Sequence, residues 1–176
     1  MTSRFHFFTG RPSLDFCNTG GPNFELLDVP EALGQWLTEA GYSGPPARPS
    51  RAELHAAQDL RDALHGALLV GDTDGVADLV DAWLEPALVR ICVDRETLGT
   101  HHVPAERTCR CALVPVALDA LAVVRNYPDR VRECASEACP ALFLDLSRNR
   151  SRRWCSMDVC GSREKARTYY RRHRGA

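Results

Sequence analysis

Apolar residues in the first half of the chain recur at helical spacing. The most regular run lies between Ser50 and Gly71, where leucine and alanine repeat every three or four positions. Ser50 and Glu53 at its start form the sequence signature of a capping box. Weaker runs of the same period predict two more helices, over residues 28–41 and 73–85, the second stopped by a proline. This part of the chain is therefore expected to be mostly helical.

The first 28 residues are less regular. Three phenylalanines between Phe5 and Phe8 predict a short extended segment, Gly10 to Pro12 predicts a turn, and the next residues suit either a strand or a short helical turn. Asp28 is expected to cap the helix that follows it. Residues 41–50 contain three prolines and two glycines, which predicts a loop.

Between residues 88 and 112 the pattern becomes alternating. The segments LVRICVD and RTCRCAL place apolar or sulfur-bearing residues at every second position, and ETLGTHHVPAE separates them, which predicts a β-hairpin. A second metal site can be imagined here from His101, His102, Cys109 and Cys111. Small cysteines buried on one strand face also explain the C-x-C step. A further apolar segment, residues 114–131, predicts a helix that leads directly into the C-terminal region.

That C-terminal region contains the most specific motif of the chain. Cys134, Cys139, Cys155 and Cys160 form two C-x4-C pairs separated by fifteen residues. Two short knuckles joined by a longer segment can bring four thiolates to one tetrahedral zinc ion, so we expect one structural zinc. Four thiolate ligands leave no open coordination position, and the chain has no G-x-S-x-G, H-E-x-x-H or phosphate-binding glycine loop, so the protein is not expected to be an enzyme.

Two other interpretations of the cysteines remain open. Eight cysteines could pair as disulfides, but no signal-peptide or membrane-spanning pattern is present, so a reducing cytoplasm is expected, where metal binding is favoured. The second interpretation is a redox switch, in which oxidation of the cysteines releases the metal. The remaining Cys17 and Cys92 are expected to pack as small hydrophobic side chains, and His55 and His65 lie too far apart on one helix to share a metal.

The charge is divided between the two parts of the chain. Of 22 basic and 23 acidic residues, ten basic and four acidic lie from Cys134 onward, a balance of +6 that leaves −7 for the preceding part. In this tail, residues 134–176, the segment LFLDL predicts a short strand after the second cysteine, and RSRRWC predicts the strand that pairs with it in a hairpin. A helix is predicted over residues 162–173. On that helix Arg163, Arg167, Arg171 and Arg174 share one face, whereas Ala166, Tyr169, Tyr170 and His173 can pack inward or line an edge.

The segment from Cys134 to Arg163 resembles the CGNR zinc finger of bacterial proteins, with Ser162 where that motif has asparagine. The segment LDFCNT, Leu14 to Thr19, resembles the opening signature of the ABATE domain that precedes this finger. The resemblance implies a stress-associated bacterial transcription regulator with a C-terminal DNA-binding finger. We expect an α+β fold: residues 1–130 as a mostly helical body with a β-hairpin and a possible sensor role, and residues 131–176 as a small treble-clef-like zinc finger with a basic helix.

The tail is accordingly expected to bind DNA, because arginine forks match phosphate oxygens and guanine edges. The expected contacts are Arg148, Arg150, Arg152, Arg153, Arg163, Lys165, Arg167 and Arg171. Arg152, Arg153 and Arg163 could instead balance the charge of the zinc thiolates. A zinc-stabilised module that binds a protein partner is the alternative function, with the body as a small-molecule sensor. Asp15 and Asn18 are the only candidates for a polar site in that body, and they could equally be residues that stabilise a turn.

Overall fold

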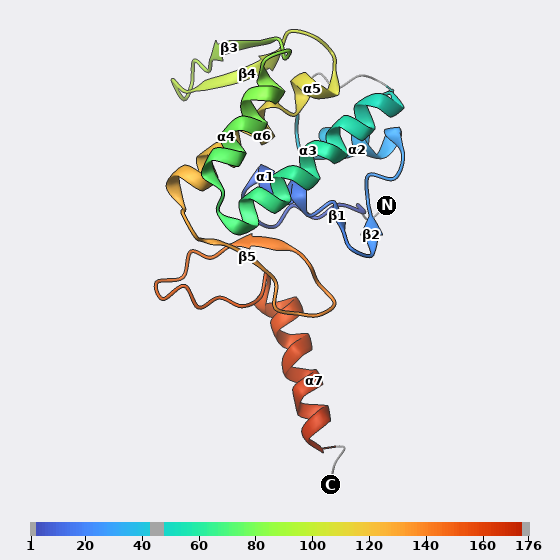
Figure 1. Ribbon diagram of the computed structural model, residues 1–176, viewed down its shortest axis with the longest axis vertical. Coiled ribbons are helices and arrows are strands. Elements are labelled where there is room, and N and C mark those ends of the chain that lie inside the picture. The colour runs from blue at the N-terminus through green and yellow to red at the C-terminus, as the bar shows by residue number, and fades with distance from the viewer. Residues whose placement is uncertain (1–2, 43–47, 174–176) are drawn as a thin grey trace.

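The computed structural model describes residues 3–42 and 48–173. These residues form an α+β fold in which a helical body carries a zinc finger, and the last helix extends away from both (Figure 1). Within the described residues the strands pair as three separate two-stranded sheets. No described helix is long and apolar enough to span a membrane. Residues 43–47 of the predicted loop over residues 41–50 lie outside the described residues, and so does Arg174.

The core of the body lies between helices. The long helix α3 (Arg51–Val70) packs against α4 (Thr73–Leu84) and α1 (Pro12–Cys17), and α6 (Val114–Asn126) packs on α1 and α4. Helix α2 (Pro30–Glu39) contacts α3 on the side of the body near the N-terminus (Figure 1). The fully buried side chains come from all of these elements, and the largest is Trp36 of α2. The helical periodicity in the sequence thus marks one continuous core.

The predicted capping box is confirmed. The Ser50 hydroxyl accepts a hydrogen bond from the backbone N–H of Glu53 (3.1 Å), and the Glu53 carboxylate accepts one from the backbone N–H of Ser50 (2.8 Å). Burial pushes the pKa of Glu53 upward, but these bonds and one from the Cys109 N–H outweigh it and hold that pKa below its usual value. Gly71 ends the helix with φ 70°, a conformation that glycine adopts without strain.

Two helix boundaries differ from the prediction. Asp28 does not cap α2, because the N-cap residue is Val29 and the Asp28 carboxylate instead accepts a hydrogen bond from Arg4 (2.9 Å). Helix α6 ends at Asn126 rather than continuing to residue 131. Pro128 explains this end, since the residue before a proline is disfavoured in helical geometry.

The predicted β-hairpin forms, but its second strand was wrongly placed. Strand β3 (Val89–Val93) pairs antiparallel with β4 (Thr100–Pro104), so both strands lie before the RTCRCAL segment. That segment contains a short helix, α5 (Cys109–Ala112), which the Thr108 hydroxyl caps by accepting from the Cys111 N–H. The alternating pattern predicted a strand here, but a single helical turn can also bury two cysteines that are separated by one residue.

The remaining strands connect the N-terminus and the finger to the body. Strands β1 (Gly20–Gly21) and β2 (Phe24–Glu25) form a small hairpin, and Glu25 accepts two hydrogen bonds from the buried Arg61 of α3 (2.6 and 2.8 Å). Strand β5 (Val131–Glu133) pairs antiparallel with β6 (Leu142–Leu144). The predicted partner of LFLDL was therefore wrong: β6 pairs with the segment before the first cysteine, and RSRRWC contains no strand.

Candidate metal centre and basic helix

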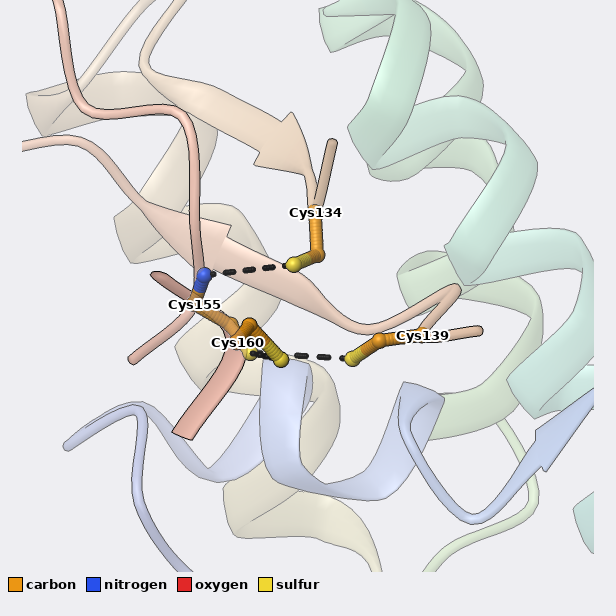
Figure 2. A group of neighbouring side chains, drawn as sticks. All are labelled: Cys134, Cys139, Cys155 and Cys160. Atoms are coloured by element: carbon orange, nitrogen blue, oxygen red, sulfur yellow. Dashed lines mark hydrogen bonds between the residues drawn. The ribbon is translucent and has the colours of Figure 1, made fainter. Parts of the chain in front are cut away.

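Four cysteine sulfurs converge at the base of the last helix. The Sγ atoms of Cys134, Cys139, Cys155 and Cys160 all lie within 4.8 Å of one another, and Figure 2 shows them pointing toward a common centre. Two of the separations are 3.7 Å (Cys139 to Cys155) and 3.6 Å (Cys155 to Cys160). A tetrahedral site with Zn–S bonds of about 2.3 Å has sulfurs about 3.8 Å apart. The four sulfurs therefore lie as close together as a zinc tetrathiolate requires.

Backbone hydrogen bonds set this geometry. The first knuckle turns through a bond from the Cys139 N–H to the Ser136 carbonyl (2.8 Å), and it is joined to the second by a bond from the Ala135 N–H to the Arg153 carbonyl (2.8 Å). The Cys155 N–H also points at the Cys134 sulfur, 3.5 Å away (Figure 2). Such N–H groups stabilise thiolate charge, as expected of ligand sulfurs.

Without a metal, the crowded thiols do not ionise alike, since burial pushes the pKa of Cys134 upward but hydrogen bonds, foremost one from the Cys155 N–H, outweigh burial and lower that pKa. Burial first, and then the neighbouring thiols, raise the pKa of Cys155. Burial likewise raises the pKa of Cys160, to about 11. Two close thiolates repel each other, so the cluster ionises fully only with a divalent metal at its centre. The donor set and spacing fit one structural zinc ion, which cross-links the knuckles when bound.

The last ligand leads directly into the basic helix. A π-helical turn, Met157–Gly161 (η1), begins at Ser156, whose hydroxyl accepts from the Val159 N–H (3.3 Å), and it continues as α7 (Ser162–His173). Side chains fasten the base of α7 to the first knuckle. The Ser136 hydroxyl donates to Glu164 (3.0 Å), and Arg167 forms ion pairs with Glu137 (2.5 Å) and Glu164 (2.9 Å). The metal and these contacts together fix the direction in which α7 leaves the finger.

Two of the expected nucleic-acid contacts have structural partners. Arg167 is engaged by the two glutamates just described. Arg152 donates to the carbonyls of Trp154 (2.9 Å) and Cys155, and its guanidinium lies 4.9 Å from the centre of the Phe143 ring. Arg152 therefore supports the second knuckle. Arg153 lies 5.2 Å from the Trp154 ring but remains exposed.

The other five basic residues carry exposed charge. Within the described part of the chain, no ion pair within 4 Å and no internal hydrogen bond is formed by the side chains of Arg148, Arg150, Arg163, Lys165 and Arg171. Three lie on α7 and two on the loop between the knuckles. The hydrogen bond from Arg167 is the main cause that lowers the pKa of Glu137, and Arg171 is close enough to this carboxyl group to lower that pKa further. Tyr169 and Tyr170 of α7 are 59% and 65% exposed, so they do not pack inward. The Tyr169 ring instead stacks on His173 with 4.1 Å between ring centres.

The loop that carries Arg148 and Arg150 is organised by a residue that sequence reasoning did not single out. The Asp145 carboxylate is fully buried and accepts hydrogen bonds from the Ser147 N–H (2.8 Å), the Ser147 hydroxyl (2.6 Å) and the Arg152 N–H (3.1 Å). Burial pushes its pKa upward, but these hydrogen bonds outweigh burial and hold the pKa below its usual value. The D-x-S sequence, typical of an Asx turn, was the available signal.

Of the two candidate polar residues of the body, Asp15 lies on α1 and Asn18 is the C-cap residue that follows this helix. The Asp15 carboxylate accepts from the backbone N–H groups of Phe8 (3.2 Å) and Thr9 (3.1 Å), and burial raises its pKa. The Asn18 amide donates to the Leu142 carbonyl (2.9 Å) and accepts from the Leu142 N–H (2.7 Å). Asp15 thus holds the N-terminal segment, and Asn18 joins the body to strand β6 of the finger. Both also line a cavity between these parts.

The second metal site considered from the sequence does not form. In residues 3–42 and 48–173, the four-cysteine cluster is the only group with metal-ligand geometry. His101 and His102 lie on β4, whereas Cys109 and Cys111 are buried on α5. Cys17 is also buried, and Cys92 is half-buried.

This arrangement defines the class of protein: a helical domain joined to a structural zinc finger. Comparison with family models then identifies the chain. The CGNR zinc finger model matches residues 130–173, and the ABATE model, described as "Putative stress-induced transcription regulator", matches residues 10–127. Since the ABATE match covers more than half of the chain, the protein belongs to that family. No curated protein matches the sequence.

Proposed function

We propose that this protein regulates transcription by binding DNA through the zinc finger and α7. The observation that carries the proposal is the placement of α7, which extends away from the body with its exposed cationic residues (Figure 1). A zinc ion with four thiolates carries a charge of −2, so the tail keeps a balance of about +4 by formal count when the metal is bound. In the described structure Arg148, Arg150, Arg163 and Lys165 form no ion pair that DNA would have to displace.

The two groups of free cations suggest a division of roles. Arg163, Lys165 and Arg171 lie on a helix, an element that fits the major groove, while Arg148 and Arg150 lie on the adjoining loop. Exposed arginines beside a groove-bound helix contact phosphates and set the register, whereas base edges carry the specificity. The exposed Tyr169 and Tyr170 add aromatic surface on the same helix.

Salt dependence of DNA binding tests the proposal. With a duplex isolated from a random pool by the zinc-loaded protein, the double variant Arg150→Ala with Arg171→Ala should lower the slope of log K against log salt by about two, one for each lost phosphate contact. The matched control is Arg125→Ala, an exposed arginine on α6. Zinc-stripped protein should enrich no sequence.

Two results would contradict DNA binding. One is an affinity that does not fall with salt, and the other is a double variant indistinguishable from Arg125→Ala. Absence of any enriched DNA favours the alternative in which the same cations contact an acidic protein surface.

A further inference from the structure

A cavity of about 670 Å³ lies where the N-terminal segment, α1 and the finger meet. Its walls are mainly apolar and include Phe7, Phe8, Phe24, Leu26 and Val159. The three phenylalanines are 38–43% exposed, and Val159 is 55% exposed, so these side chains keep apolar surface that is not buried in the protein core. Cavities of roughly 300–1,000 Å³ with such walls are the usual size for small organic ligands.

The wall of this cavity also contains a nucleophile. The sulfur ligands Cys139, Cys155 and Cys160 line it, and of these only Cys139 is half-buried, whereas the other two are buried. In the described structure Cys134 receives a backbone N–H bond, but Cys139 receives none. Hydrogen bonds to a thiolate withdraw its charge, so Cys139, which is the least buried of the four and receives no backbone N–H bond from the described residues, is expected to be the most reactive.

The charges around the cavity select what can enter. The zinc thiolate cluster is negative, and Asp15 places a carboxyl group in the wall. Arg163 supplies one cation, and the charge of Arg4 is matched by Asp28. The balance is negative, which disfavours organic anions, and apolar walls disfavour strongly hydrated cations. An uncharged apolar molecule fits best.

We propose that the cavity admits uncharged, apolar electrophiles with a carbon–carbon double bond conjugated to a carbonyl, and that Cys139 is alkylated there. The Cys139 sulfur forms a bond to the β-carbon, the carbon–carbon π bond breaks, and the resulting enolate takes a proton from water. No oxidant or reductant is consumed. The product is a neutral thioether, a poorer ligand than a thiolate, so the adduct weakens the metal site that holds α7.

The test uses full-length, zinc-loaded protein and N-phenylmaleimide at half an equivalent. Peptide mass mapping reports which cysteine reacts, and a chromogenic chelator reports released zinc. Cys139 should react at least about tenfold faster than Cys92, because Cys139 lines the apolar cavity that holds the probe beside its sulfur, whereas Cys92 lies on β3 outside that cavity. One zinc should be released for each adduct. N-(4-carboxyphenyl)maleimide, an anionic probe of similar reactivity, should lose this preference for Cys139.

Variants of the cavity wall complete the design. Phe8→Ala and Phe24→Ala should each slow modification of Cys139 several-fold while leaving the rate at Cys92 unchanged. The matched control is Val70→Ala, because Val70 is an exposed apolar residue at the end of α3, outside the cavity wall. Zinc content checks that each variant is folded, and the comparison of the two probes needs no variant. The proposal is overturned if Cys139 reacts no faster than Cys92, if the two probes behave alike, or if the adduct retains zinc. Because no measurement involves DNA, failure here leaves the proposed function untouched, and the reverse also holds.

Discussion

Replacing Asn18 with alanine tests whether the body and the finger are joined as the structure indicates. The Asn18 amide makes two hydrogen bonds to the backbone of Leu142, at 2.7 and 2.9 Å, and Leu142 is completely buried. The substitution leaves a buried N–H and a buried carbonyl without that partner. Each such group costs about 1–3 kcal/mol. Since Asn18 borders the cavity, water can partly replace the amide, and we expect a loss of about 2–3 kcal/mol in total.

Urea denaturation of the zinc-loaded protein measures this loss. With a typical slope of about 2–3 kcal/mol per molar, the midpoint should fall by about 1 M. Asn126→Ala is the matched control, because Asn126 is exposed at the end of α6 and has no side-chain hydrogen bond in the described structure. If Asn18→Ala and Asn126→Ala unfold at the same urea concentration, the amide does not hold the finger, and the reasoning is refuted.

Two further predictions concern the metal and an acidic residue. Chelation of zinc, or Cys139→Ser, should unfold the two cysteine knuckles and α7, because the knuckles share a small cluster of buried side chains, while α3 and α4 keep their helical circular dichroism signal. Cys92→Ser should retain one zinc, and metal-free knuckles that still resist hydrogen exchange would contradict the expectation. Burial raises the pKa of Asp15, so its ionised form is less favourable in the folded state than in the unfolded state. Asp15→Asn should therefore be more stable than the parent at pH 7, and this advantage should shrink as the pH falls through the raised pKa toward that of the unfolded chain; thermal melts between pH 3 and pH 7 that show a constant difference disprove it.

The metal centre could be predicted from the sequence because ligand spacing is a local property. Two C-x4-C steps determine two knuckles, whatever surrounds them. The helix after Ser50 was equally accessible, since its cap and its apolar period agree. What the sequence did not reveal is pairing between distant segments. Strand β6 lies beside β5 rather than beside RSRRWC, and no local pattern distinguishes these partners.

The roles of individual polar residues were also hidden in the sequence. Arg152 and Arg167 look like their neighbours in composition, yet one supports a knuckle and the other binds two glutamates. Asn18 appeared as a turn residue or a ligand contact, and its partner Leu142 lies 124 positions away. Such roles depend on which carbonyls and carboxylates tertiary packing brings near, so they follow only from the folded structure.

Because η1 continues into α7 without a break, a rotation at the metal centre turns the whole last helix. A helix of twelve residues is about 18 Å long, so a rotation of about 10° at its base moves the far end by about 3 Å. That displacement is comparable to the length of a hydrogen bond, and Arg171 lies near the far end. Cys160 lies at the base of this helix, in the π-helical turn that precedes α7. A sub-ångström change at one sulfur is thereby magnified at the guanidinium groups.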